Sequence, residues 1–461
     1  MKYVRYLYAL LWLCVLPLVL LRLIWRSRDD PGYRHHMRER LGCYPPLPSV
    51  GNWIWIHAVS VGETYAAQPL VQTLLTQYPN VRIVLTHMTP TGRKTGSALF
   101  AEYIRQGRMQ QVYAPYDFPW FVQRFFRHIR PSLGLLIETE VWPNFVWIAQ
   151  TYNIPLALIN ARMSPRSFKR ATYLTCIQHA ARQLFGAIPL ILAQTQTDAA
   201  RLRELGGKQV EICGNLKFDR NADPLHIQQG LSLRKRIGTR WVLCAASTRE
   251  GEETLILNAW QQFQQTHAHH NPAHPCTHSA TDPANHTEHV APPLLLLVPR
   301  HPQRFSEVAH IVHKHGLTYA LRSALPSHTT SSHWVIPPTT QVLIGDSLGE
   351  MASYYSACDI ALIGGSLLPF GGQNLIEACA LGKPILLGPH TFNFYQASKD
   401  AVAEGAAIQM THTELLAQHI HDLFNDPARL ARMGQASQRF AQTYRGATTR
   451  ITHALLPYLP D

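Results

Sequence analysis

Apolar runs typical of buried strands recur along the chain, and helical patterns separate them. In the first half these runs occupy residues 82–87, 133–140, 154–162 and 190–196. In the second half they occupy residues 241–248, 293–300, 341–346, 359–366 and 383–389. Near-continuous apolar strands that alternate with helices are typical of parallel sheets covered on both faces. The pattern therefore predicts an α/β protein with two Rossmann-like domains.

The two sets of strands meet around the stretch KFDRNADPLHIQQG, residues 217–230. We expect an N-terminal anchor over 1–28, a first domain over 29–220, a linker over 221–240 and a second domain over 241–461. Ligands in such folds bind at the carboxyl ends of the strands. In a two-domain version, the cleft between the domains is the natural site.

One segment of the second domain departs from this pattern. Residues 264–293 contain seven histidines and five prolines and almost no large apolar side chains. Such a segment cannot bury a core, which predicts a disordered loop inserted between a helix and a strand. Because the histidine spacing is irregular and no cluster of carboxylates accompanies the histidines, we expect no functional metal site there.

The N-terminus carries an apolar run at residues 6–25, in which Arg22 is the one charged residue. A spanning helix needs roughly 20 apolar residues, so the run is long enough to anchor the chain. No small-x-small cleavage site follows it, which disfavours a cleaved signal peptide. Pro17 and Arg22 leave open whether the segment spans the bilayer or lies in its surface.

The charged residues near this apolar run predict its orientation in the membrane. The 461 residues have a net charge of +13, and residues 1–40 hold Lys2 and seven arginines against three acids. Such an excess suits nucleic acid, anionic lipid or phosphorylated substrates, and its position beside the apolar run favours lipid. By the positive-inside rule, we expect the bulk of the chain in the cytoplasm.

Motifs for common cofactors are missing from the sequence. No G-x-G-x-x-G follows a strand, and no G-x-x-x-x-G-K-[ST] occurs. No D-x-D occurs either, so the usual carboxylate pair for a metal-held sugar nucleotide is absent. We therefore expect no metal and no cofactor.

Three strand-to-helix turns in the second half are candidates for anion binding. GGQNLIEACALGKP (371–384) places glycines before a helix, with Asn374 and Glu377 on one face, where phosphate and ribose hydroxyls can bind. Arg300 ends a strand and can hold a phosphate or a base carbonyl. Gly349 and Glu350 begin another helix. The alternatives are ordinary helix starts and a surface arginine.

The stretch WIHAVSVGET (55–64) ends a strand and then places Glu63 just before a helical pattern. A carboxylate at the carboxyl edge of a sheet can take the proton of an incoming hydroxyl group. The alternative is that Glu63 caps the helix, because acids are favoured at helix N-termini. The residues alone leave both interpretations open.

Ten motifs, in order from about residue 53 to 450, resemble those of the 3-deoxy-D-manno-octulosonic acid (Kdo) transferases of lipopolysaccharide synthesis. The His-rich insert departs from the family pattern, and GGQNLIE differs slightly from the usual sequence of this motif in the family. The motifs are HAVSVGET, THMTPTGR, ETEVWPN, INARMS, GNLKFD, STREGEE, VPRHPQRF, GDSLGEM, GGSLLPFGGQNLIEA and GPHTFNF.

The resemblance implies a GT-B glycosyltransferase with two Rossmann-like domains facing a central cleft and an N-terminal anchor helix. It implies transfer of Kdo from CMP-Kdo to the lipid A precursor (lipid IVA), without a metal, at the cytoplasmic face of the inner membrane. The expected partners are this donor, this acceptor and anionic membrane lipid, with no nucleic acid. An activated hydroxyl attacking opposite CMP predicts inversion at the anomeric carbon.

Residue by residue, the resemblance implies that Glu63 is the general base and that Glu138 and Lys217 stabilise the transition state. Arg93, Lys94, Arg162 and Arg166 follow first-domain strands and are candidate contacts for the lipid phosphates, with solvated surface charge as the alternative. The implied CMP contacts are Pro299, Arg300, Leu348, Gly349, Glu350, Asn374, Leu375, Ile376 and Glu377.

Two other functions remain as alternatives. One is a GT-B enzyme that transfers a different sugar from a UDP-sugar to a lipid. The other is a membrane-tethered basic protein that binds nucleic acid or anionic lipid, with steep salt dependence and no need for Glu63. Neither explains ten family motifs in order.

Overall fold

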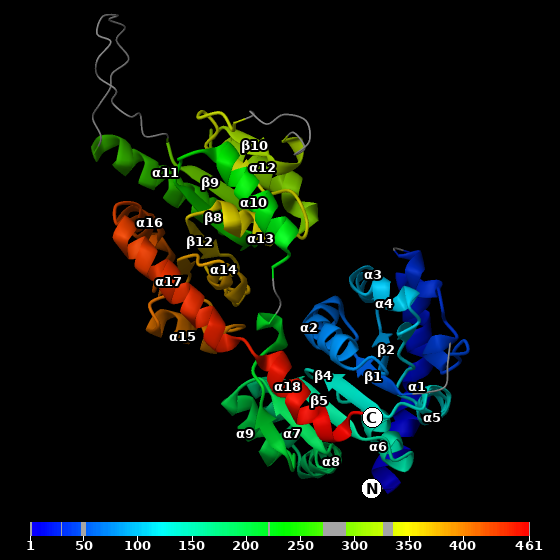
Figure 1. Ribbon diagram of the computed structural model, residues 1–461. Helices are drawn as coiled ribbons and strands as arrows, with labels where there is room; N and C mark the ends of the chain where they lie inside the picture. Colours follow the sequence, from blue (N-terminus) through cyan, green and yellow to red (C-terminus); the bar gives the residue numbers. More distant parts are fainter. Residues whose placement is uncertain are drawn as a thin grey trace, which may run out of the picture. The chain divides into compact units, whose positions relative to one another are not determined.

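The computed structural model describes residues 2–28, 30–47, 52–219, 222–270, 292–325 and 335–460. The chain forms two compact units (Figure 1). Unit 1 comprises Met1–Arg220 and Tyr444–Asp461, and unit 2 comprises Asn221–Thr443. Each unit is built on a seven-stranded sheet whose paired strands are all parallel. This confirms the two α/β domains expected from the strand pattern.

The sheet of unit 1 has the strand order β3-β2-β1-β4-β5-β6-β7. Its strands are β1 (Trp53–His57), β2 (Arg82–His87), β3 (Met109–Tyr113), β4 (Leu133–Ile137), β5 (Leu156–Ala161), β6 (Leu190–Ala193) and β7 (Val210–Ile212). Its α-helices are α1 (Lys2–Arg26), α2 (Val61–Gln77), α3 (Pro90–Leu99), α4 (Ala101–Arg105), α5 (Pro119–Ile129), α6 (Pro143–Thr151), α7 (Pro165–Thr172), α8 (Thr175–Phe185), α9 (Gln196–Glu204) and α18 (Ala447–Leu455). Its 3-10 helices are η1 (Pro31–Arg34), η2 (Glu39–Leu41), η3 (Leu216–Phe218) and η7 (Leu456–Tyr458).

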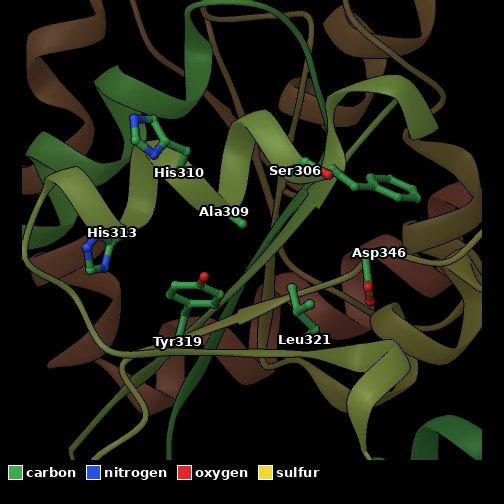
Figure 2. A pocket seen from close by; sticks show the side chains of 8 residues that line it. Ser306, Ala309, His310, His313, Tyr319, Leu321 and Asp346 are labelled. Atoms are coloured by element: carbon green, nitrogen blue, oxygen red, sulfur yellow. The ribbon is translucent and has the colours of Figure 1, made fainter.

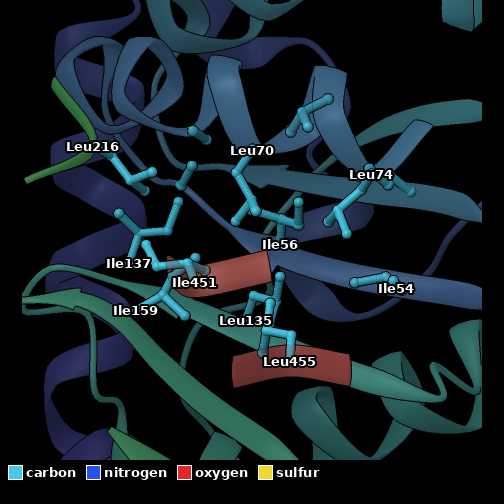
Figure 3. Close-up of a cluster of buried hydrophobic side chains, with 14 of the residues drawn as sticks. Ile54, Ile56, Leu70, Leu74, Leu135, Ile137, Ile159, Leu216, Ile451 and Leu455 are labelled. Atoms are coloured by element: carbon cyan, nitrogen blue, oxygen red, sulfur yellow. The ribbon is translucent and has the colours of Figure 1, made fainter. Parts of the chain in front are cut away.

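Apolar side chains cover both faces of this sheet, as a parallel sheet requires. On one face, Leu70 and Leu74 of α2 and Ile451 and Leu455 of α18 belong to a fully buried cluster with strand residues (Figure 3). On the other face, a buried aromatic cluster surrounds Trp55, whose ring stacks on Phe145 at a centroid distance of 5.0 Å.

The C-terminal segment differs from the sequence-based boundary, which assigned all of 241–461 to the second domain. Tyr444–Asp461 belongs to unit 1, and Figure 1 shows the red helix α18 among the elements of that unit. The apolar side of α18 supplies Ile451 and Leu455 to the core of unit 1. The Asp219 carboxylate accepts hydrogen bonds from the backbone N–H of Gly446 (2.7 Å) and of Thr448. Chain order does not reveal which core an apolar helix face will join.

The sheet of unit 2 has the strand order β10-β11-β9-β8-β12-β13-β14. Its strands are β8 (Val242–Thr248), β9 (Leu294–Pro299), β10 (Tyr319–Leu321), β11 (Val342–Ile344), β12 (Ile360–Ile363), β13 (Ile385–Leu387) and β14 (Ala407–Gln409). Its α-helices are α10 (Pro224–Ile237), α11 (Glu252–His270), α12 (Phe305–Lys314), α13 (Met351–Ala357), α14 (Ile376–Ala380), α15 (Tyr395–Ala403), α16 (Leu416–Phe424) and α17 (Pro427–Tyr444), the last ending at the unit boundary. Its 3-10 helices are η4 (Pro302–Arg304), η5 (Arg322–Ala324) and η6 (Thr413–Leu415).

Two further segments of unit 2 differ from expectation. Most of the expected linker 221–240 is helix α10, which packs on α13: the Ser353 hydroxyl donates to the His226 carbonyl at 2.8 Å. Residues 264–270 of the His-rich stretch continue helix α11. Residues 271–291 of that predicted disordered loop lie outside the described residues, and Pro292 and Pro293 directly precede β9.

Helix α1 is a candidate anchor, because Arg5–Arg26 is long and apolar enough to cross a membrane. One side of the helix contacts the rest of unit 1: the Tyr8 hydroxyl donates to the buried Asp117 carboxylate at 2.9 Å, and Trp12 lies beside Tyr116. Its remaining surface exposes large apolar side chains such as Leu7 and Trp25.

Candidate active site

Glu63 lies in the first turn of α2, just beyond the carboxyl end of β1. Ser60 begins the helix with extended backbone, and its hydroxyl accepts from the Glu63 N–H at 3.3 Å. Glu63 Oε2 in turn accepts from the backbone N–H of Ser60 (3.3 Å) and of Val59 (2.7 Å). This is a capping box, and it fixes the carboxylate at the edge of the sheet.

The other oxygen of this carboxylate, Oε1, accepts no hydrogen bond from the described part of the chain. Partial burial raises the pKa of Glu63 to about 7, and the carboxylate of Glu140 and, less strongly, that of Glu138 act in the same direction. Hydrogen bonds from Ser60 and Val59 oppose the shift. Glu63 therefore caps the helix with one oxygen and leaves the other, with a pKa suited to a base at neutral pH, for a proton donor.

Glu138 and Lys217 form an ion pair, with 2.7 Å between Nζ and Oε1. Glu138 follows β4, the neighbour of β1, and has a left-handed backbone with φ of 57°. Lys217 lies in η3, whose first N–H groups are held by the side chains of Asn160 (3.0 Å to Leu216 N) and Asn215 (3.0 Å to Lys217 N). The pairing indicates that Glu138 orients the Lys217 ammonium group.

Sequence reasoning missed two residues of this site, Glu140 and Trp142. The Trp142 indole donates to Glu140 Oε2 at 2.9 Å, and the buried His57 ring meets the Trp142 ring edge-on at 4.7 Å. Burial also raises the pKa of Glu140. Both residues stand in the ETEVWPN motif, so the signal was present, but their relation to Glu63 depends on the adjacency of β1 and β4.

The four basic residues proposed for lipid phosphates fall into two groups. Arg93 pairs with the buried Glu39 at 2.7 Å, and its guanidinium lies 5.0 Å from the Tyr113 ring centroid. Lys94, Arg162 and Arg166 have exposed side chains. Arg93 therefore helps to build unit 1, while the other three remain available to a ligand.

In unit 2 the expected donor contacts all follow the carboxyl ends of strands. Pro299 is the last residue of β9 and Arg300 follows it; the Arg300 N–H donates to the Thr248 carbonyl at 3.0 Å, and the Arg300 side chain is exposed. Leu348 and Gly349 follow β11. Leu348 is 70% exposed and Gly349 has φ of 83°.

Glu350, Asn374 and Glu377 have hydrogen-bonded side chains. Glu350 pairs with Arg322 at 3.3 Å and accepts from the Ser347 hydroxyl. Asn374 Oδ1 accepts from the Ile376 N–H at 3.0 Å, and its amide donates to Glu377 Oε1 at 3.2 Å. Asn374 thus lies two residues before the five-residue helix α14 and binds its first N–H group, while Leu375 and Ile376 are buried.

Two buried acids that sequence reasoning missed hold this edge in place. Glu252 accepts backbone N–H bonds from Arg249 (2.8 Å), Gly365 (2.6 Å) and Leu367 (2.9 Å). Glu253 accepts two hydrogen bonds from Arg304, at 2.7 and 3.1 Å. The STREGEE and VPRHPQRF motifs contain these residues. The pairing across β8 and β9 becomes visible only in the fold.

A cavity of about 480 Å³ lies at the β10 side of unit 2. Figure 2 shows His310 and His313 of α12 opposite Tyr319 and Leu321 of β10, with Asp346 at one end. No expected CMP contact lines it. Among the described residues, no group of three or more His, Cys, Asp or Glu side chains is placed to hold a metal ion.

Comparison with known proteins identifies relatives along nearly the whole chain. Residues 35–220 match the family model of 3-deoxy-D-manno-octulosonic-acid transferase (kdotransferase). A 3-deoxy-D-manno-octulosonic acid transferase of Bordetella pertussis is 40% identical over 91% of this chain and 90% of its own length. A transferase of the same name from Haemophilus influenzae is 33% identical over 99% of both chains.

Solved structures show the same fold at low identity. A UDP-GlcNAc 2-epimerase from Neisseria meningitidis covers 88% of this chain and 100% of its own, with a TM-score of 0.56 and 13% identity. This likeness concerns the fold alone, which is that of two parallel-sheet α/β domains resembling GT-B glycosyltransferases.

Proposed function

Since this chain belongs to the 3-deoxy-D-manno-octulosonic acid (Kdo) transferase family, we propose that it moves Kdo from CMP-Kdo to the lipid A precursor lipid IVA. Membership of this family implies a glycosyltransferase of lipopolysaccharide synthesis. The donor, the acceptor, the stereochemistry and the residue roles are parts of the proposal. The observation that carries it is the Glu63 carboxylate, whose Oε1 accepts no hydrogen bond from the described residues and whose pKa is raised to about 7.

In the proposed reaction Glu63 accepts the proton of a primary hydroxyl on the acceptor as the oxygen attacks the anomeric carbon of Kdo. The bond between that carbon and the phosphate oxygen of CMP breaks, and CMP leaves with the bonding electron pair. Attack opposite the leaving group inverts the anomeric carbon. No metal takes part in this scheme.

Charge develops on both sides of the breaking bond, and paired side chains are available to stabilise it. The Lys217 ammonium, oriented by Glu138 at 2.7 Å, supplies positive charge. Arg300 and the backbone groups around Asn374 and Glu350 are the proposed contacts of CMP. The buried acids Glu252 and Glu253 support these contacts by holding the turns that carry them.

We propose that the enzyme works at the cytoplasmic face of the inner membrane. Helix α1 supplies the apolar surface, and the arginines that follow it can attract anionic headgroups, each contributing about 1 kcal/mol near the surface. Because the lipid acceptor lies in the same membrane, the anchor brings enzyme and acceptor to one surface.

The test is Kdo transfer from CMP-Kdo to lipid IVA, measured for the wild type, Glu63→Gln and Ser60→Ala. Glu63→Gln keeps a side-chain oxygen for the helix cap but cannot take a proton, so we expect transfer to fall at least about 100-fold. CMP binding should be unchanged. Ser60→Ala removes the other half of the capping box. It should lower the free energy of unfolding by about 1 kcal/mol and keep most of the transfer activity.

Equal transfer by Glu63→Gln and the wild type would contradict the base assignment. A wild type that transfers no Kdo would contradict the proposed function itself. A product that retains the anomeric configuration of the donor would contradict direct displacement.

A further inference from the structure

The order of strands in unit 2 places β8 between β9 and β12. The proposed donor contacts follow β11, β9 and β12, so a ligand that reaches from Arg300 to Asn374 crosses the carboxyl end of β8. The residue that follows β8 is Arg249. The donor contacts carried over from the family include no residue of this central strand end.

The side chain of Arg249 is held in place without being neutralised. Its guanidinium carbon lies 4.5 Å from the centroid of the Phe370 ring, and its Cγ lies close to Gly365. Its backbone N–H is fixed by Glu252 at 2.8 Å. Arg249 Nε is buried and has no hydrogen-bond partner, and the guanidinium forms no ion pair in the described part of the chain.

Two neighbouring arginines, which follow β9 and β10, differ from Arg249 because each forms an ion pair with a carboxylate. Arg304 is neutralised by Glu253 at 2.7 Å and Glu307 at 3.1 Å, and Arg322 pairs with Glu350 at 3.3 Å. Arg249 and Arg300 remain without a carboxylate partner among the described residues. This edge therefore offers two uncompensated guanidinium groups.

The proposed donor carries two anionic groups, the phosphate of CMP and the carboxylate of the sugar acid. With Arg300 assigned to the nucleotide, we propose that Arg249 binds the carboxylate of Kdo and so selects a sugar acid over a neutral sugar. A guanidinium fork matches a carboxylate geometrically, and the Phe370 ring limits the orientations that the fork can adopt. The inference rests on the proposed function, because it takes CMP-Kdo as the donor.

Calorimetric titration of the full-length protein with CMP and with CMP-Kdo, without lipid acceptor, isolates the contribution of the sugar. Arg249→Ala should weaken CMP-Kdo binding about ten- to a hundredfold and change CMP binding less than about twofold. Arg249→Lys, which keeps a positive charge, should recover part of the loss. Arg300→Ala should weaken both ligands, and Arg432→Ala, an exposed residue of α17, should weaken neither.

Unchanged CMP affinity also shows that the Arg249→Ala variant is folded. An equal loss of CMP and CMP-Kdo affinity would assign Arg249 to the phosphate and overturn the inference. The inference would also be overturned if the wild type transfers Kdo and Arg249→Ala prefers CMP-Kdo over CMP as strongly as the wild type does. A wild type that neither transfers Kdo nor binds CMP-Kdo differently from CMP would overturn the proposed function together with the inference.

Discussion

At the scale of single residues, the carboxylates of the candidate site form hydrogen bonds that stabilise the fold and are also candidates for the proposed chemistry. Glu63 caps α2 through Oε2, and its Oε1 accepts no hydrogen bond from the part of the chain that the structure describes, so the two interpretations of this residue do not exclude each other. Glu140 raises the pKa of Glu63 by its negative charge, and Trp142 holds Glu140 with an indole N–H at 2.9 Å. The sequence showed these acids but not their proximity.

This arrangement predicts the pH dependence of transfer. A general base must be deprotonated, so kcat/KM should fall as pH drops through about 7, not through the ordinary glutamate value of 4.5. Glu140→Gln removes a nearby negative charge and so lowers the pKa of Glu63. The pH at which kcat/KM falls should therefore be lower in this variant. The exposed Glu102 serves as the control, because Glu102→Gln should leave the profile unchanged. If kcat/KM of Glu140→Gln falls at the same pH as that of the wild type, Glu140 does not raise the pKa of Glu63.

At the scale of elements, helices are assigned to units by the cores they enter. Helix α18 follows all of unit 2 in the chain, yet its apolar side chains lie in the core of unit 1. The Asp219 carboxylate, two residues after Lys217, accepts from the N–H of Gly446 at 2.7 Å. The segment that carries Lys217 is therefore tied to the C-terminal helix.

This assignment predicts which unit a core mutation destabilises. Ile451→Ala opens a cavity beside β1 and β4, so it should lower the unfolding free energy of unit 1 by about 2–5 kcal/mol. Hydrogen exchange should then accelerate in β1 and β4 and stay unchanged in β8. Leu423→Ala in α16, which is buried in the core of unit 2, should give the reverse pattern. Faster exchange in β8 of the Ile451→Ala variant would contradict the assignment.

At the scale of the whole molecule, α1 combines an attachment to unit 1 with a large apolar surface. The Tyr8 hydroxyl donates to Asp117, which also accepts the N–H groups of Asn144 and Phe145 at the start of α6. Helix α1 is thus tied to Asp117, the carboxylate that binds the first N–H groups of the helix after Trp142. Leu10, Leu11 and Leu18 remain exposed on α1.

The proposed anchoring role of α1 predicts how the protein partitions between membrane and solution. Removing residues 2–26 should release the protein from sedimented membranes, because the main apolar contact with lipid is lost. Tyr8→Phe keeps that apolar surface and removes only the bond to Asp117, so it should stay with the membrane at low and high salt. Equal sedimentation of the truncated chain would show that another surface binds the bilayer.

The sequence by itself determined what depends on neighbouring residues. The buried strands, the Ser60–Glu63 cap signal, the apolar N-terminal segment and the ordered motifs of the family are all properties of short stretches. From these, the two α/β domains and the family followed, and the structure and the comparisons confirm both.

Only the tertiary structure decided what depends on strand order. The pair of Glu138 with Lys217, the effect of Glu140 on Glu63 and the place of α18 in unit 1 all join residues from separate elements. The position of Arg249 between the ends of β9 and β12 has the same origin. A chain with alternating strands and helices can be wound in several orders, and side chains far apart in sequence meet only once one order is adopted.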